Sequence, residues 1–460
     1  MEGDNFNQIK EEAKKKAEYD AIPVISYSEF QAVINKWLLI ADKGVVKLVV
    51  ATVIANMLPS DPIWVFLVGK SGGGKTELMN GLLKLPQYYS LSQLTPNTFL
   101  SGYKSKDKEP SLLLQLGSGK TLGFKDFTSL LDGNKDDLKA LLGQFRELYD
   151  QHMVKRTGTG DTITWKGKMG FLAGTTRMIE ERMSIVGAMG ERFMNYYITQ
   201  PEQVEVRKRM KQNLGKEKQM RDEIQDAFAG YLKGIIIPEN LPEIPPDVDA
   251  MIQSLSDFIA MARTVVMRDF TSKHEISYIA DSEMTTRVYK QLLTVAITLL
   301  IMNGGDQWLE EDTYIVKKLA LSSIHSKRLD ILKTLQQYKT QVKTSTLSVT
   351  LGYPTSTIRN TLEELAAIKM DEMRIITRIH QVKGKPDLWE LTISMKRILI
   401  DMGESVEATK EDGGFEKDEE EIPVGALPED AGSRQEEFMN QKVEELTDGM
   451  TQDELKDLGL

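Results

Sequence analysis

The chain has 460 residues, of which 41% are hydrophobic and 27% charged, the balance of an ordinary soluble globular protein with room for two or three domains. It contains no cysteine, which excludes disulfides, zinc fingers and thiol chemistry. The net charge is −10, but residues 404–445 hold fifteen acidic and four basic side chains, so the rest of the chain is near neutral at about +1. The polar, acidic N-terminus is no signal peptide, and no apolar stretch is long enough to span a bilayer. We therefore expect a cytoplasmic protein with no membrane partner.

Residues 1–24 form a charged leader, and helical periodicity runs from Tyr27 to Leu58. Pro59 and Pro62 end this pattern because two prolines so close together cannot continue a helix. We expect this segment to be a helical cap packed beside the next strand.

Residues 65–77 read VFLVGKSGGGKTE and contain the pattern G-x-x-x-x-G-K-[ST] between an apolar strand and a helical pattern. Such glycines let successive backbone N–H groups turn inward around a phosphate. Lys75 would reach the β- and γ-phosphates, and the Thr76 hydroxyl would bind Mg²⁺. The motif predicts ATP and Mg²⁺ as ligands, bound by Gly69, Lys70, Ser71, Gly72, Gly73, Gly74, Lys75, Thr76 and Glu77.

A second nucleotide element is expected at residues 121–128. Here an apolar strand ends in Asp126, which is typical of a Walker B strand whose acid holds the Mg²⁺ shell. The alternative is an ordinary strand followed by an exposed acid. Upstream, residues 86–98 predict a short strand with turns and residues 112–116 a possible strand, and residues 135–149 predict an amphipathic helix.

The next segment predicts a β-hairpin over residues 153–168, since two β-type runs flank a Thr-Gly-Thr-Gly turn. A buried strand follows at residues 169–174, with Thr175 and Thr176 at its end, and another strand is expected at residues 195–199. Residues 25–200 would thus form one α/β nucleotide-binding core.

Residues 201–327 read as an all-α segment, in which the charge-rich stretch 201–233 is best interpreted as a solvated helix. Residues 328–400 predict three helices and a two-stranded wing, a winged helix-turn-helix with residues 355–365 in the recognition position. Its predicted DNA contacts are Arg359, Asn360, Lys383 and Lys385, although this fold also serves protein contacts. Residues 401–460 are acidic and poor in aromatics, which favours disorder, and form either an inert tail or a partner-docking one.

The order of these elements resembles an AAA+ P-loop ATPase with a parallel sheet, an α-helical lid and a C-terminal winged helix. The hairpin before the fourth core strand and the Glu191-Arg192-Phe193 step resemble the minichromosome maintenance helicase and replication-initiator clade. The resemblance covers roughly residues 25–400 and places Thr175 or Thr176 as sensor 1, Arg192 as arginine finger and Arg287 as sensor 2. It also implies that Lys155 and Arg156 on the hairpin touch DNA in the pore of a homo-oligomeric ring.

One departure concerns the catalytic base. The family's Walker B acid is followed by a glutamate that orients the attacking water, whereas Phe127 follows Asp126 here. Either Asp126 does both tasks, or another acid such as Glu77 or Glu147 is the base, or hydrolysis is slow. This leaves ATP binding more firmly indicated than ATP turnover.

Three functions follow as expectations. The first is an ATP-dependent, DNA-binding motor of the replication initiator or helicase kind, whose simple organisation suits a phage or mobile element. The second is an ATP-gated regulator or helicase loader that does not unwind DNA. The third is a defence or partner-recognition ATPase whose winged helix, or acidic tail, holds a protein.

Overall fold

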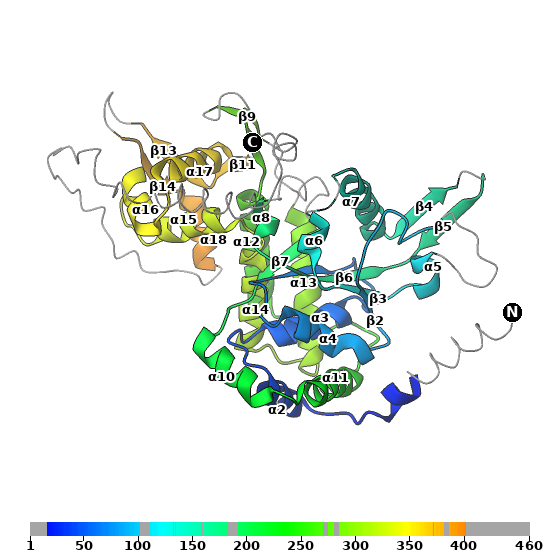
Figure 1. Cartoon of the computed structure of the whole chain (residues 1–460). Helices are drawn as coiled ribbons and strands as arrows, with labels where there is room; N and C mark the ends of the chain where they lie inside the picture. The colour runs from blue at the N-terminus through cyan, green and yellow to red at the C-terminus, as the bar shows by residue number, and fades with distance from the viewer. Residues whose placement is uncertain are drawn as a thin grey trace, which may run out of the picture. The chain divides into compact units, whose positions relative to one another are not determined.

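The computed structural model describes residues 16–101, 111–131, 133, 135–157, 160–181, 192–269, 275–279, 285–370, 372–380 and 386–401. Figure 1 labels its helices and strands, and the same labels are used below.

The glycine-rich loop predicted to bind phosphate, residues 69–76, follows a strand of a five-stranded parallel sheet with the order β2-β3-β6-β1-β7, and this predicted site is called the phosphate-binding loop below. Strand β1 lies between β6 and β7. Its last residue, Val68, pairs with Thr175 of β6, and its first residue, Trp64, pairs with Phe193 of β7. The strands are β1 Trp64–Val68, β2 Tyr88–Leu91, β3 Lys120–Phe124, β6 Met169–Thr175 and β7 Phe193–Tyr197. Since all pairs are parallel, all strands end at one edge, called the carboxyl edge here, and begin at the opposite amino edge.

The central strands β1 and β6 are buried along their whole length, which explains their continuous apolar sequences. Successive side chains point to opposite faces of the sheet. Trp64 and Phe66 join an aromatic core with Phe171 on one face, while Val65 and Leu67 join the core on the other. The sheet is therefore covered on both faces.

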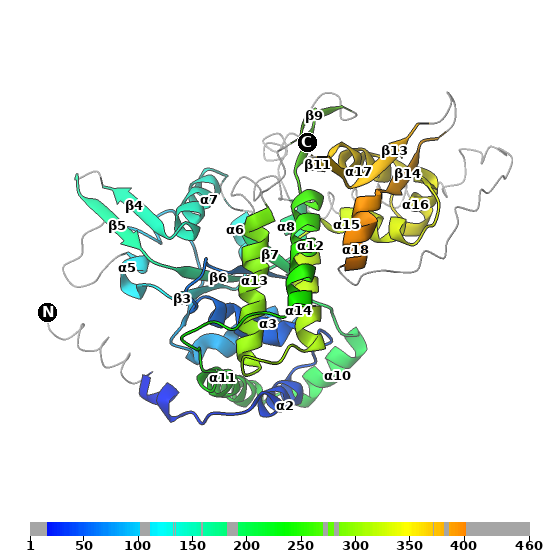
Figure 2. The same ribbon diagram turned by 180° about the vertical axis from the view of Figure 1, so that it is seen from behind.

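Helices from three parts of the chain cover the Val65 face (Figures 1 and 2). They are α2 Tyr27–Trp37, α3 Val45–Ala55, α4 Lys75–Gly81 with the 3₁₀ turn η1 Leu82–Lys84, α11 Glu217–Lys233, α12 Pro246–Ala262, α13 Thr285–Met302 and α14 Glu310–Leu321. α11 packs against α2 and α4, α13 against α3, and α14 against β7. Helices α11, α12, α13 and α14 thus share one hydrophobic core with the sheet.

Local capping explains where the first two helices begin. Ser26 and Glu29 form a capping box at the start of α2, with each side chain accepting a hydrogen bond from the other's backbone N–H. The buried carboxylate of Asp42 accepts hydrogen bonds from the N–H groups of Gly44 and Val45 at the start of α3.

The opposite face is covered by α5 Leu112–Leu116, α6 Phe127–Leu131, α7 Lys135–Tyr149 and the hairpin of β4 His152–Arg156 and β5 Thr162–Lys166. Short α8, Met178–Glu181, follows β6. The bounds of α7 are those predicted, and the predicted hairpin is present.

The expectation of a strand at residues 112–116 is wrong, because these residues form helix α5. Leucine and glutamine favour a helix more than β-branched residues do, and Leu-Leu-Leu-Gln-Leu has no β-branched member. Gly117 ends the helix with a positive φ of 72°.

The remaining elements form a charged helix, an insertion and a C-terminal group. The expectation of a solvated helix over residues 201–233 is correct only for α10, Gln203–Asn213, which buries none of its side chains. It is wrong for α11, which packs an apolar face with Ile224 and Phe228 into the core. The expectation of an all-α segment over residues 201–327 is wrong in one place, because a two-stranded insertion, β8 Val266–Arg268 with β9 Ile276–Ile279, separates α12 from α13. None of the helices in the described ranges is long and apolar enough to cross a membrane.

Residues 326–401 contain three helices, a small antiparallel sheet of order β10-β14-β13, and a last helix that packs on α12. The elements are α15 Ser326–Gln336, β10 Val342–Lys343, α16 Thr344–Leu351, α17 Thr355–Ala367, β11 Lys369–Met370, β12 Met373–Arg374, β13 Ile376–Ile379, β14 Leu388–Leu391 and α18 Ile393–Asp401. Trp389 is fully buried between this sheet and the helices, and its Nε1 donates to the Thr344 hydroxyl.

Candidate nucleotide-binding site

The phosphate-binding loop connects the end of β1 to the start of α4 at the carboxyl edge. Gly72 and Gly74 have φ values of 73° and 83°, a region that side chains rarely tolerate. At Gly73 a Cβ would lie 3.0 Å from the backbone oxygen of Lys70 and 2.6 Å from the side-chain amide of Gln200, which would have to move. The loop therefore requires these glycines, and Gln200, which sequence reasoning missed, packs against it.

Lys75 is buried and lies inside this loop. Its Nζ donates to the carbonyl oxygens of Gly69 at 2.7 Å and Lys70 at 2.8 Å. Burial lowers the pKa of Lys75, and the charge of Asp126 partly opposes that shift. The positive charge of a buried ammonium is poorly compensated when its hydrogen-bond acceptors are mainly neutral carbonyls. A phosphate would supply the missing negative charge. Thr76, the next residue, is exposed and free to face a metal ion.

Asp126 follows β3 and caps helix α6, since its Oδ1 accepts a hydrogen bond from Thr128 N at 3.1 Å. Phe127, at the position of the family's glutamate, is fully buried and packs against the rings of Phe66, Phe124 and Phe193. Residue 127 thus points into the core, and its phenyl ring cannot orient a water molecule.

Three threonine hydroxyls meet beside Asp126. Thr128 Oγ1 lies 3.3 Å from Thr175 Oγ1 and 3.4 Å from Thr176 Oγ1, and it accepts a hydrogen bond from Thr176 N at 3.1 Å. Thr175 is 1% exposed, whereas Thr176 is half-buried and accessible from the carboxyl edge. The two predicted sensor residues are therefore neighbours of the phosphate-binding loop, and Thr128 was missed because only the fold brings it to them.

The two alternative bases lie in different places. Glu77 is held by Arg221 of α11 in a two-point ion pair, with distances of 3.0 and 3.3 Å. Glu147 is exposed near the C-terminal end of α7, where Tyr149 packs on Trp64 at the amino edge. Because the phosphate-binding loop is at the carboxyl edge, this location does not favour Glu147 as the base.

Arg192 and Arg287 also lie at the amino edge. Arg192 directly precedes β7, donates to the Asp150 carboxylate at 3.1 Å and stacks over the Tyr149 ring. Arg287 lies one turn before Gln291 in α13, and the Gln291 side chain donates to Tyr149 OH at 3.1 Å and to Arg192 O at 2.9 Å, so the start of α13 is beside this ring. Burial raises the pKa of Tyr149 to about 12. Neither arginine is near the phosphate-binding loop of its own chain.

The hairpin turns its two predicted DNA-binding residues to opposite faces. Lys155 pairs with Ile163 on the inner face, and its Nζ donates to Asn97 Oδ1 and Leu100 O, both at 2.8 Å. Arg156 is exposed on the outer face, together with Lys166. The outer face is thus the one able to meet a ligand.

Helix α17 exposes Arg359 and is held over residues 360–364. Arg268 of the β8–β9 insertion donates to the backbone oxygen of Asn360 at 2.6 Å and forms ion pairs with Glu363 and Glu364. The predicted contacts Lys383 and Lys385, the acidic segment after residue 401, and Glu191 lie outside the described residues.

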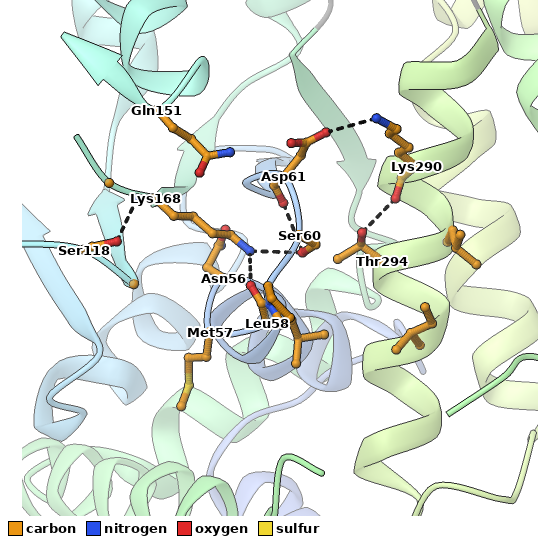
Figure 3. A pocket seen from close by; sticks show the side chains of 15 residues that line it. Asn56, Met57, Leu58, Ser60, Asp61, Ser118, Gln151, Lys168, Lys290 and Thr294 are labelled. Carbon is orange, nitrogen blue, oxygen red and sulfur yellow. Dashed lines mark hydrogen bonds and ion pairs between the residues drawn. The ribbon is translucent and has the colours of Figure 1, made fainter. Parts of the chain in front are cut away.

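A separate cavity of about 810 Å³ lies at the amino edge between the end of α3 and α13 (Figure 3). Lys168 lines it, and its Nζ donates to Ala55 O at 2.9 Å, Leu58 O at 2.8 Å and Ser60 Oγ at 3.1 Å. Burial lowers the pKa of Lys168 to about 8, partly opposed by Asp61. The three acceptors bind all three ammonium protons of Lys168. Lys168 therefore stabilises the loop between α3 and β1.

No family model and no curated protein matches the sequence. Among the solved structures that match is one titled a "putative ATPase" from Cytophaga hutchinsonii. It is 14% identical, with a TM-score of 0.38, and the match covers 79% of this chain and 99% of that chain. A likeness this distant leaves the functional argument to the geometry of the site.

Proposed function

We propose that the protein is a P-loop ATPase that binds ATP with Mg²⁺ at the carboxyl edge of its sheet. The observation that carries this proposal is the buried Lys75 ammonium inside a glycine loop, beside Asp126 and the three threonines. Lys75 would bind the β- and γ-phosphates, and Thr76 and Asp126 would hold the metal. Mg²⁺ would neutralise charge on the phosphate oxygens.

In the hydrolytic step, the threonines and Asp126 would position the γ-phosphate and the attacking water. Thr176, the more accessible sensor, would polarise the γ-phosphate or the attacking water, with Thr175 behind it. Asp126 follows β3 at the carboxyl edge, whereas the carboxylate of Glu77 is already paired with Arg221, so we expect Asp126 to orient water as well as metal. Without a glutamate at position 127, we expect slow turnover.

At a finer level, we propose a DNA-dependent AAA+ motor of the minichromosome maintenance or replication-initiator kind. The hairpin directly before β6 and the three helices with an antiparallel sheet in residues 326–401 support this assignment, the latter as a winged helix. DNA would meet Arg156 on the hairpin and Arg359, Asn360, Lys383 and Lys385 on the winged helix. The placement of Arg192 and Arg287 away from their own loop supports a ring in which both act on a neighbour.

One observation favours a second candidate, an ATP-gated regulator or helicase loader without unwinding activity. Phe127 is buried where the family has its base, which suits a switch that binds ATP and hydrolyses it rarely. Strand displacement from a forked duplex separates the two candidates. Unwinding would support the motor, and DNA-stimulated ATPase without unwinding would support the switch. ATP binding without DNA affinity would instead support a partner-recognition ATPase in a cytoplasmic pathway.

The test of the proposed ATPase is Lys75→Ala, with Lys70→Ala as the matched control in the same loop. A charged hydrogen bond contributes about 1.5–3 kcal/mol, so Lys75→Ala should weaken ATP binding about 10- to 100-fold. The predicted contact of Lys70 with a phosphate is through its backbone N–H, and its side chain is exposed, so removing that side chain should change affinity by less than about threefold. Binding of a fluorescent ATP analogue measures both variants, and circular dichroism checks the fold. Equal affinity of wild type and Lys75→Ala would overturn the proposal.

A further inference from the structure

Thr128 is the centre of the hydroxyl cluster at the carboxyl edge. Its Oγ1 accepts a hydrogen bond from Thr176 N at 3.1 Å, so its single hydroxyl proton is left to donate to another group. The acceptors within reach are the hydroxyls of Thr176 at 3.4 Å and Thr175 at 3.3 Å. Thr128 therefore touches both sensor residues at once.

The direction of these hydrogen bonds determines where the Thr176 proton points. Thr176 Oγ1 also accepts from Met178 N at 3.4 Å, and a hydroxyl has two acceptor sites and one proton. Thr128 has one proton for two neighbouring hydroxyls, and either partner of each pair can be the donor; in the arrangement in which Thr128 donates to Thr176 rather than to Thr175, both acceptor sites of Thr176 are filled. Its own proton is then directed away from the protein, toward the open carboxyl edge.

We propose that Thr128 is a positioning residue that orients the Thr176 hydroxyl toward the γ-phosphate and so compensates in part for the missing Walker B glutamate. The inference rests on the proposed ATPase function. A hydrogen-bond donor aligned in advance stabilises the charge of the transition state without reorganisation during the reaction.

The capping of α6 does not require the Thr128 side chain. The helix start is held by the Thr128 backbone N–H on Asp126 Oδ1 and by the Ser129 hydroxyl, which donates to Asp126 O at 2.8 Å. Ser129 is exposed and does not touch the sensor residues in any hydrogen bond of the described chain. Ser129→Ala is therefore the matched control, because it removes a hydroxyl from the same helix and leaves the cluster intact.

The experiment measures single-turnover hydrolysis and nucleotide affinity for wild type, Thr128→Ala, Thr128→Val, Thr128→Ser and Ser129→Ala. Thr128→Ala and the isosteric Thr128→Val should each lower the hydrolysis rate about tenfold, the effect of removing about one hydrogen bond from the transition state. Affinity for ATP and ADP should stay within about twofold, and Thr128→Ser should recover most of the rate. Ser129→Ala should match wild type.

Binding of ADP with aluminium fluoride, a mimic of the transition state, gives a readout that does not depend on turnover. Thr128→Ala should bind this complex about tenfold more weakly than wild type while binding ADP equally well. Wild-type rates in Thr128→Ala, or no rescue by serine, would overturn the positioning role. Failure of wild type to bind any nucleotide would instead overturn the proposed function, and the inference with it.

Discussion

At Gly174, strand β6 comes close both to Lys75 of the phosphate-binding loop and to the turn that carries Asp126. A Cβ at this position would lie 2.6 Å from Lys125 O, just before Asp126, and 3.7 Å from Lys75 Cε. Only glycine lets β6 pass this close to both the phosphate-binding lysine and the acid-bearing turn. The close approach to a backbone atom means that any side chain must move the turn itself.

We predict that Gly174→Ala lowers the free energy of unfolding by about 1–3 kcal/mol, the usual range for an added atom in a packed site. It should also weaken ATP binding, because the displaced turn carries Asp126. The control is Gly143→Ala in α7, where a Cβ meets no atom within 4 Å. That exchange should stabilise the protein by about 0.5–1 kcal/mol through helix propensity. Urea denaturation measures both, and an unaffected Gly174→Ala protein would contradict the close approach.

Lys168 offers a prediction about pH. Its pKa is lowered to about 8 in the folded protein from the ordinary value of 10.5, chiefly by burial. Between these values the unfolded chain binds more protons, so the contribution of Lys168 to stability rises with pH from about 8 to 10.5 and declines as pH falls. The difference in unfolding free energy between wild type and Lys168→Met should therefore increase over this range.

At the scale of elements, the sequence predicted those features whose signal is local. The phosphate-binding turn, the β3 strand, α7 and the β4–β5 hairpin each follow from spacing within about fifteen residues. Leu112–Leu116 was assigned wrongly because a five-residue apolar run has no distinctive period. Thr128, Gln200 and Arg221 could not be predicted as site neighbours, since their interactions join residues far apart in the sequence and depend on sheet order.

The hairpin carries a prediction about DNA. Arg156 and Lys166 share the exposed face, whereas Lys155 is hydrogen-bonded to Asn97 and Leu100. Arg156→Ala with Lys166→Ala should weaken DNA binding for all sequences and reduce the salt slope by about 0.9 for each phosphate that is no longer neutralised. Lys155→Ala should leave the slope unchanged and lower thermal stability instead. Fluorescence anisotropy at several salt concentrations tests this, and a slope change confined to Lys155→Ala would reverse the assignment of the faces.

At the scale of the whole molecule, the parallel sheet separates the phosphate-binding loop from the two arginines. Arg192 precedes the first residue of β7, which pairs with the first residue of β1, while Gly69 follows the last residue of β1. Five residues of strand span roughly 15 Å, too far for an arginine that is already paired with Asp150. Any action of Arg192 on a nucleotide must therefore be on that of a neighbouring subunit.

The final prediction tests this arrangement by mixing two inactive proteins. Lys75→Ala subunits keep Arg192 but lack the lysine, and Arg192→Ala subunits keep the phosphate-binding loop but lack the arginine. Because an arginine supplied to the γ-phosphate contributes several powers of ten to turnover, each variant alone should be nearly inactive. In a mixed ring, an intact loop next to an intact Arg192 forms one complete site, so part of the ATPase activity should return in proportion to the frequency of such neighbours.

Asp150→Asn, which removes the ion pair but keeps the arginine, should retain activity. Full turnover by Arg192→Ala alone, or no recovery in mixtures shown by crosslinking to contain both variants, would exclude Arg192 as a finger.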